Sequence, residues 1–348
     1  MYIDKITFNQ SHGGSDVVLK LGTSADHFAG WVVVIGDNGA GKSYLLQRIV
    51  QCLYAKTATS DGGCRPTDFA VHLSADVEHI PSFPPVLFSQ ESHADIGSWL
   101  GYLHGKSSQA VIGGKPEAEQ QIITLMRLLN DAFLPPAWHA QRIDDEGLWL
   151  GNRHVQAVRW TDAGHGIRSA VCLLITILRA VFGVLAHGDD VRKAAGVVLI
   201  DDSELHLHPA WQRQIGFWLI KHFPLVQFIV CTHSPLICQA AQQVFVLSCL
   251  EAEHKAGIRC LSMQELSAIQ TSRPDTILRT AAFGLDNTRS PLAVESRARY
   301  AKLQSKKRAG VALSNEELAL ERQVLRFVEN GEDGQREMTV ANREMGRG

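Results

Sequence analysis

The sequence predicts an α/β fold, in which a mixed, mostly parallel sheet is covered by helices and built around a phosphate-binding loop. The first indication is a continuous apolar run at 31–35 that leads directly into a glycine-rich octapeptide at 36–43. A segment with helical apolar spacing follows, up to residue 54. The second indication is an alternation of helix-like and strand-like segments, in the order 169–185, 196–200, 209–222, 226–231 and 243–249. Such alternation is typical of parallel strands covered by helices.

The octapeptide matches the phosphate-binding pattern G-x-x-x-x-G-K-[ST] at every fixed position. Glycines let backbone N–H groups turn inward around phosphate oxygens, and the helix N-terminus that follows favours negative charge. We expect Lys42 to reach the β- and γ-phosphates of ATP and the Ser43 hydroxyl to ligate Mg²⁺. The predicted nucleotide-binding residues are Gly36, Asn38, Gly39, Ala40, Gly41, Lys42, Ser43 and Tyr44. A glycine-rich turn that matches by chance is the alternative, and the flanking strand and helix disfavour it.

The composition is that of a soluble globular protein. The chain has 348 residues, of which 45% are apolar and 20% charged, and its net charge is −2. Contact with nucleic acid would therefore need a local basic patch. The seven cysteines form no C-x-x-C pair and most lie in apolar runs, which favours reduced thiols. We read no apolar run of membrane-spanning length and no basic leader, and we expect a cytoplasmic protein that has no contact with a membrane.

The domain boundaries follow from changes along the chain in the density of turn residues and in the regularity of apolar spacing. Residues 55–154 are rich in turn residues and contain one clear helix, 117–133, so we interpret them as an insertion. Ser290-Pro291 and the capping box that starts at Ser314 predict a hairpin of two helices, 291–309 and 315–329. The expected parts are a head (1–54 and 155–250), the insertion (55–154), a C-terminal helical region (251–330) and a disordered tail (331–348).

Acidic and imidazole side chains follow two of the predicted strands. Asp201 and Asp202 end the strand at 196–200, where an acid at the carboxyl edge of the sheet would hold Mg²⁺ beside the phosphate loop. Asp202 is then placed to polarise the attacking water, and His233 follows the next strand, where it would sense the γ-phosphate. The alternatives are a strand-ending turn aspartate and a buried histidine bonded to a carbonyl.

Several segments carry a family resemblance. They are I-D-D-S-E-L-H-L-H-P at 200–209, W-Q at 211–212, F-P at 223–224, Q-F at 227–228, C-T-H-S-P at 231–235, and the tail segments 275–285 and 289–291. These segments resemble ABC-type ATPases of the RecF, SMC and OLD kind, and most of all the AAA-family ATPases of bacterial anti-phage systems such as Septu and certain retrons. The resemblance covers roughly residues 1–54 and 155–300.

The resemblance implies a dimer in which two heads enclose two nucleotides, each ATP meeting a signature motif of the partner. The degenerate match is 160–166, with Gly164 as the signature glycine. Gln90 would be the loop glutamine that touches Mg²⁺ and the attacking water. Asp202 stands where the family normally has glutamate, and a carboxylate misplaced by about 1 Å can cost about 10²-fold in rate. We therefore predict slow hydrolysis; Glu204 would substitute for Asp202 or support the loop.

Two further features remain open. His206 and His208 alternate on an extended segment, but no third metal ligand is apparent. The basic residues Arg297, Arg299, Lys302, Lys306, Lys307 and Arg308 form the concentrated positive run of the tail. This run would contact DNA or RNA, or it is a solvated face balanced by the acidic helix that follows. The hairpin could equally dock the effector or the second ATPase subunit.

The sequence contains no nuclease motif after the ATPase core, so we expect the effector, a nuclease or toxin, to be a separate polypeptide. Three hypotheses remain: an ATPase subunit of an anti-phage complex, a DNA-repair ATPase of the RecF or SMC type, and a scaffold that holds ATP without hydrolysing it. The turn-rich insertion lacks sustained heptads, which counts against the long coiled-coil arm expected of the repair ATPases.

Overall fold

The computed structural model of the chain describes residues 3, 5–8, 17–24, 27–58, 69–73, 87–88, 93–110, 116–135, 137–154, 156–186, 188–202, 204, 207–250 and 255–329. The chain divides into two compact units, Met1–Gly284 and Leu285–Gly348. The tail 331–348, predicted to be disordered, lies outside the described residues.

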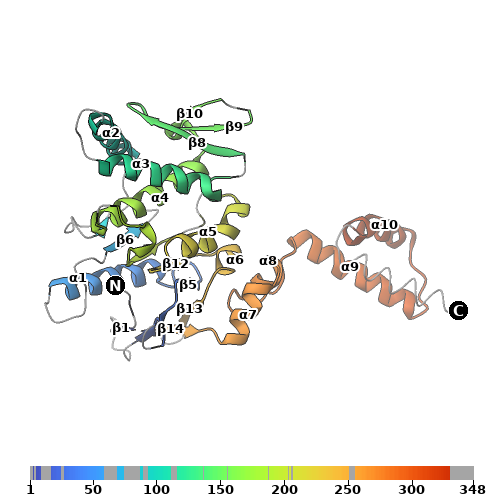
Figure 1. Cartoon of the computed structure of the whole chain (residues 1–348). Coiled ribbons are helices and arrows are strands. Elements are labelled where there is room, and N and C mark those ends of the chain that lie inside the picture. Colours follow the sequence, from blue (N-terminus) through green and yellow to red (C-terminus); the bar gives the residue numbers. More distant parts are fainter. Residues whose placement is uncertain are drawn as a thin grey trace. The chain divides into compact units, whose positions relative to one another are not determined.

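The described strands of the first unit include a seven-stranded sheet in the order β14-β13-β5-β12-β11-β6-β7 (Figure 1). Neighbouring strands pair in parallel, except that β13 and β14 are antiparallel. The strands are β5 Trp31–Gly36, β6 Phe69–Leu73, β7 Leu87–Phe88, β11 Gly196–Ile200, β12 Val226–Cys231, β13 Gln243–Leu250 and β14 Lys255–Cys260. The predicted mixed, mostly parallel sheet is confirmed.

Two of these strands come from the segment 55–154, which the sequence had led us to interpret as an insertion. β6 pairs with β11 along its whole length, and β7 pairs with β6. A strand of five residues produces no clear periodicity in a turn-rich stretch, so the sequence pattern did not reveal β6. The sheet therefore takes strands from both sides of the predicted boundary near residue 55.

Helices cover both faces of the sheet. The apolar side of α1 (Lys42–Ala58) packs against one face, together with alternate residues of β5, Val32 and Val34. Val33 and Ile35 point to the opposite face, into the core that α4 (His165–Val184) and α5 (Pro209–His222) share. Successive side chains of β5 thus point to opposite faces of the sheet, as strand geometry requires. Both sets are apolar because helices cover both faces.

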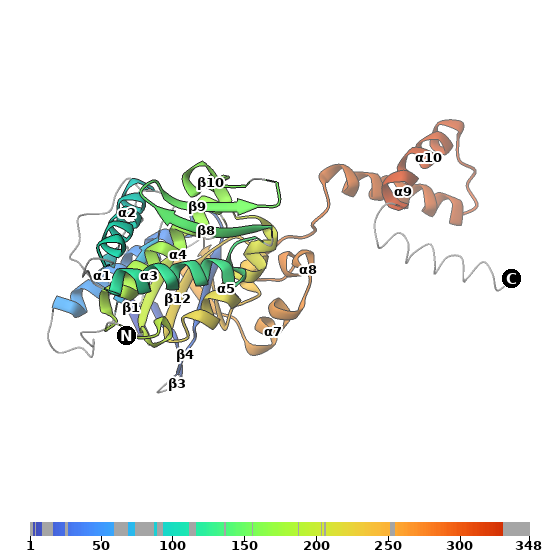
Figure 2. The same ribbon diagram turned by 45° about the horizontal axis from the view of Figure 1, so that its top comes forward.

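The α4 side of the molecule carries further layers. α2 and α3 pack side by side, and α3 lies against β8 (Figure 2). These elements are α2 His93–Ala110, α3 Pro116–Leu128, a π-helical turn Leu129–Phe133, and an antiparallel sheet of β8 Trp138–Asp144, β9 Gly147–Asn152 and β10 Val158–Arg159. The helix expected over 117–133 corresponds to α3 and the π-helical turn.

The remaining described elements of this unit are short. They are β1 Lys5–Phe8, β2 Val17–Lys20, β3 Gly22–Ser24, β4 His27–Phe28, the 3₁₀ turns Trp160–Asp162 and Val191–Lys193, α6 Pro235–Cys238, α7 Met263–Thr271 and α8 Pro274–Leu278.

Helix α5 is clamped onto the π-helical turn by three side chains. The Trp211 indole N–H donates to the carbonyl of Phe133 at 2.5 Å, and that of Trp218 donates to the carbonyl of Asp131 at 2.7 Å. One turn further on, His222 Nε2 lies 2.8 Å from Asp131 Oδ2, a hydrogen bond that lowers the pKa of Asp131. Two of these bonds are accepted by backbone carbonyls of the irregular turn, and together the contacts fix the end of α3 to the core.

Helix α4 has the length and hydropathy of a membrane-spanning helix, which differs from our expectation that no apolar run reaches that length. In the structure this helix is packed within the protein. Ala170, Leu174 and Ile177 are fully buried, and the helix contacts α2, α3 and β6. Its apolar composition is thus accounted for by the core that it fills.

The second unit contains the predicted helical hairpin, which is confirmed. α9 (Pro291–Arg308) and α10 (Asn315–Glu329) are joined by a short turn that contains Gly310, whose φ is 73°. Ser314 and Glu317 form the predicted capping box, with N–O distances of 3.2 Å and 3.0 Å.

Acidic side chains neutralise part of the basic run of α9. Lys306 pairs with Glu317 and Lys307 pairs with Glu321, in both cases across the hairpin. Arg299 pairs with Glu295 within α9. These pairs favour the solvated, charge-balanced interpretation of the run over a continuous nucleic-acid surface.

Candidate functional site

The predicted site residues meet at the carboxyl edge of three adjacent parallel strands. β5 ends in the phosphate loop, β12 ends at Thr232 and His233, and β11 ends at Asp201 and Asp202. β12 lies between β5 and β11, so the three ends are neighbours. This edge is where open α/β sheets bind their ligands.

The phosphate loop adopts a conformation that requires its glycines. Gly39 and Gly41 have φ angles of 80° and 92°, in the left-handed region that side chains rarely adopt. A Cβ atom on Gly36 would collide with the backbone oxygen of Leu247 in β13. Lys42 is buried, and its Nζ donates to the carbonyls of Gly36 and Asp37 at 3.0 and 3.1 Å. The loop therefore folds over the Lys42 side chain, whose ammonium is bonded to the first two residues of the loop.

Asp201 provides the observation that tests whether Mg²⁺ fits. Its side chain is hydrogen-bonded to Ser43, yet its Oδ1 is buried and has no hydrogen-bond partner among the described residues. Burial raises the pKa of this carboxyl. An orphaned carboxylate oxygen beside a hydroxyl is a donor set of the kind that Mg²⁺ prefers, so the residues present fit the ion. Ser43 and Asp201 would hold it, and the ion would neutralise charge on the phosphates.

We predict that Asp201→Asn makes the nucleotide-free protein more stable at pH 7. The folded-state pKa is raised above the ordinary value of 3.8, so the stabilising contribution is present below that value and is lost as the pH rises through the folded pKa. At pH 7 the ionised, poorly satisfied carboxylate costs about 1 kcal/mol, which the neutral amide recovers. Urea unfolding at pH 7 and pH 4 measures the difference, which should shrink at the lower pH.

The same variant should lose the stabilisation that Mg²⁺ and ATP together give. Asp286→Asn is a matched control, because Asp286 is exposed and makes no hydrogen bond or ion pair with the other described residues, so it should leave both quantities unchanged. A variant that is destabilised at pH 7 without nucleotide would contradict our account of Asp201.

Asp202 adopts a left-handed backbone conformation, with φ of 47°, and is half-buried. Aspartate and asparagine tolerate this region better than longer side chains do. The backbone thus gives a physical reason for a short acid at this position, which no sequence pattern predicts.

Both carboxylate oxygens of Glu204 accept hydrogen bonds from the loop that carries His233. Oε2 accepts a short hydrogen bond from the Thr232 hydroxyl, and Oε1 accepts from the His233 backbone N–H at 2.6 Å. Of the two roles that we considered for Glu204, these contacts support the bracing of the loop.

Gln212 and Ser234, to which the sequence assigned no role, extend this brace. The Gln212 amide donates to the carbonyls of Glu204 and Leu207, at 3.2 and 2.9 Å. Its oxygen accepts from the Ser234 hydroxyl at 2.7 Å. A glutamine on a helix and a serine before a proline carry no pattern that predicts such pairing, because the bond between Gln212 and Ser234 joins residues 22 positions apart.

The network joins the strand ends of β11 and β12 to the start of α5. The ends that carry Asp202 and His233 are consequently held in one fixed arrangement.

The other candidate residues lie elsewhere. Gly164 caps α4, on the face of the sheet opposite α1, and is exposed. His208 accepts a hydrogen bond from the Ala210 backbone and caps α5, which accounts for it structurally. The described residues contain no group of three or more potential metal-ligating side chains. Gln90 and His206 lie outside the described residues.

Comparison with known proteins matches residues 105–239, less than half of the chain, to a family described as "AAA domain, putative AbiEii toxin, Type IV TA system". The Septu protein PtuA of Bacillus thuringiensis is 36% identical over 117 residues, which cover 33% of this chain and 29% of that protein. The retron Ec83 probable ATPase of Escherichia coli is 37% identical over 84 residues, covering 24% and 16%. The matched segments thus span less than a third of the length of these relatives.

Among solved structures, an SMC head bound to the C-terminal winged-helix domain of ScpA aligns over 77% of this chain and 99% of that one, with a TM-score of 0.48 and 15% identity. The family match and the two relatives confirm the resemblance found in the sequence. The chain is similar to ABC-type ATPases of the Septu and retron kind.

Proposed function

We propose that this chain is a cytoplasmic, slowly hydrolysing ATPase that dimerises around nucleotide and controls a separate effector, a nuclease or toxin, in anti-phage defence. The observation that carries the proposal is the strand edge at which the phosphate loop, the Ser43–Asp201 pair and the braced His233 loop meet. The resemblance to Septu and retron proteins supports the defence role.

In this proposal each group has a distinct role. Lys42 leaves the loop carbonyls to bind the β- and γ-phosphates, since phosphate oxygens are stronger partners for an ammonium than neutral carbonyls are. Bound Mg²⁺ would supply charge neutralisation on the phosphates. Asp202 orients the attacking water and accepts its proton, and His233 contacts the γ-phosphate while Glu204 holds its backbone.

Slow turnover follows from the short reach of Asp202. Its carboxylate is one methylene nearer the backbone than that of a glutamate, and the left-handed backbone disfavours the longer residue. We propose that the ATP-bound state is consequently long-lived and serves as the signal that the effector reads.

The dimer in this proposal is completed by Gly164. A Cβ atom on this glycine would meet no atom of the described residues within 4 Å, so the N-terminus of α4 would accept a nucleotide held by a second copy. Backbone N–H groups at a helix N-terminus suit a phosphate. Direct contact with DNA or RNA would use Arg297, Lys302 and Arg308, for which the described residues provide no ion-pair partner.

A native pull-down tests the proposal. The tagged chain is recovered from its own host with ATP and Mg²⁺, and bound proteins are identified by mass spectrometry. We expect a stoichiometric nuclease- or toxin-like protein with wild type and with Asp202→Asn, and its loss with Lys42→Ala. Recovery of only the chain itself, or of replication and repair proteins, would overturn the defence role.

A further inference from the structure

The hydrogen bonds of His222, the last residue of α5, fix the protonation state of its ring. Nδ1 lies 2.9 Å from the backbone oxygen of Trp218, and Nε2 lies 2.8 Å from Asp131 Oδ2. A carbonyl oxygen and a carboxylate are both acceptors, whereas a neutral imidazole has only one N–H to donate. The two contacts are both hydrogen bonds only if each ring nitrogen carries a proton, which makes the ring a cation.

The shared proton belongs to the imidazole rather than to the carboxyl group of Asp131. The Asp131 side chain is 53% exposed, and Lys221 Nζ lies 3.9 Å from its Oδ2. The hydrogen bond from His222, together with the charges of Lys221 and Arg127, holds the pKa of Asp131 below its ordinary value. Asp131 is therefore ionised at pH 7, and its oxygen can only accept from Nε2.

Two further features of this position favour a cation. The Trp218 indole stacks on the His222 ring, with 4.0 Å between the ring centroids, and the face of an indole attracts positive charge. His222 also ends α5, where the unpaired carbonyls of a helix carry partial negative charge. Burial of the ring and the cations Lys221 and Arg127 oppose the charge, but both cations are exposed, so water screens them.

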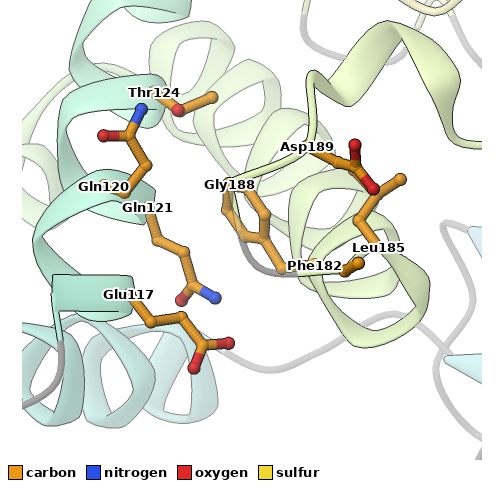
Figure 3. Close-up of a pocket in the computed structure, with 9 residues that line it drawn as sticks. Glu117, Gln120, Gln121, Thr124, Phe182, Leu185, Gly188 and Asp189 are labelled. Carbon is orange, nitrogen blue, oxygen red and sulfur yellow. The ribbon is translucent and has the colours of Figure 1, made fainter.

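The bond to Asp131 fastens a turn whose own backbone is irregular. Within the π-helical turn Leu129–Phe133, Asp131 and Ala132 depart from helical angles, and Ala132 has a φ of 56°, which a residue with a Cβ rarely adopts. Elsewhere along α3, the contact with the end of α4 includes a small pocket that Glu117 and Phe182 help to line (Figure 3). The end of α3 that is bonded to the core is thus the one that carries Asp131.

We propose that His222 and Asp131 form a pH-sensitive latch between α5 and the end of α3. While the ring is doubly protonated, it donates to both Trp218 and Asp131. When the ring loses a proton, one nitrogen presents a lone pair to an acceptor oxygen. Whichever nitrogen keeps its hydrogen, the charge attraction to Asp131 ends. The latch therefore holds the π-helical turn at low pH and holds it less tightly as the pH rises.

The latch does not depend on the proposed function, and its first test uses the nucleotide-free full chain. Long-range ¹H–¹⁵N spectra of protein labelled with ¹⁵N-histidine report which ring nitrogens carry a proton, and the His222 signals are assigned through its backbone amide. At pH 7 an ordinary exposed histidine is mostly neutral, whereas both ring nitrogens of His222 should be protonated. A singly protonated His222 ring in the wild type at pH 7 would overturn the proposal.

Matched variants test whether Asp131 holds the second proton on the ring. Asp131→Asn keeps an acceptor for Nε2 but removes the charge, so the ratio of doubly to singly protonated His222 should fall at least about tenfold. Asp145→Asn is the control, since Asp145 pairs with a different histidine, His104, at 3.5 Å. It should leave the ratio at His222 unchanged. A ratio in Asp131→Asn equal to that of the wild type would contradict the role of Asp131.

Hydrogen exchange tests the latch itself. The reporters are the Leu134 backbone N–H, which donates to the Leu129 carbonyl at 3.3 Å, and the Trp218 indole N–H, which donates to the Asp131 carbonyl. Their protection, corrected for the intrinsic pH dependence of exchange, should fall about three- to tenfold as His222 loses its proton, because a partly exposed charged hydrogen bond is lost. In Asp131→Asn, protection should be low throughout and should not follow His222. Wild-type protection that stays constant while His222 titrates would overturn the latch.

Discussion

Replacing Lys42 with alanine is expected to abolish ATP binding. The Lys42 ammonium is buried beneath the phosphate loop and now donates to the carbonyls of Gly36 and Asp37. Without it, the γ-phosphate loses its principal cation, and the loop carbonyls lose their donors. Charge-assisted hydrogen bonds of this kind contribute about 1.5–3 kcal/mol each, so two or more of them correspond to at least about a 10²-fold loss of affinity.

Titration with a fluorescent ATP analogue measures this effect. Lys221→Ala is the control, because Lys221 is an exposed lysine of α5 whose nearest acid, Asp131, is 3.9 Å away. Circular dichroism verifies that both variants remain folded. Unchanged nucleotide affinity in a folded Lys42→Ala protein would contradict the assignment of the phosphate loop.

Replacing Asp202 with asparagine is expected to lower ATP turnover by about 10²–10⁴-fold and to leave ATP affinity unchanged. This range is the usual contribution of a positioned general base. The amide has nearly the same size and tolerates the left-handed backbone, so the loop should keep its shape. Single-turnover release of labelled phosphate measures the rate, and Asp275→Asn, an exposed acid of α8, is the control.

Two further variants assign the roles within the acidic loop. Glu204→Gln keeps an acceptor for the His233 N–H and leaves a polar partner for Thr232, so its turnover should fall much less than that of Asp202→Asn. Asp202→Glu lengthens the reach by one methylene but puts a longer side chain on the left-handed backbone, so its turnover should rise by less than the about 10²-fold that reach alone would give. Equal turnover in wild type and Asp202→Asn would mean that catalysis depends on another residue or that ATP is a structural ligand.

The parts of the fold that the sequence predicted are those with strong periodicity. β11, β12 and α5 were predicted with the boundaries that the structure has, because long apolar runs and the Pro209 helix start mark them clearly. β6 and the β8–β10 sheet were missed, because short strands between turn residues have no distinct period. α2 was missed as well, because Gly97 and Gly101 interrupt its helical pattern with residues of low helix propensity.

The candidate site likewise has features that the sequence predicts and features that it does not. The phosphate loop and Asp201 carry their chemistry within a few consecutive residues, so a local pattern predicts them. The partners of Glu204 are 28 and 29 residues away, and those contacts depend on the packing of β11 beside β12. The left-handed backbone of Asp202 is equally invisible in one sequence, because aspartate occurs in many loop conformations.

Helix α5 has a mechanical consequence, since this one element is bonded both to the loops after β11 and β12 and to the irregular end of α3. Near its start, Gln212 is bonded to the loops that carry Asp202 and His233. Along the same helix, Trp218 and His222 are bonded to the irregular end of α3. A shift of the loops after β11 and β12 large enough to move Gln212 would therefore also strain the bonds that join α5 to the irregular end of α3.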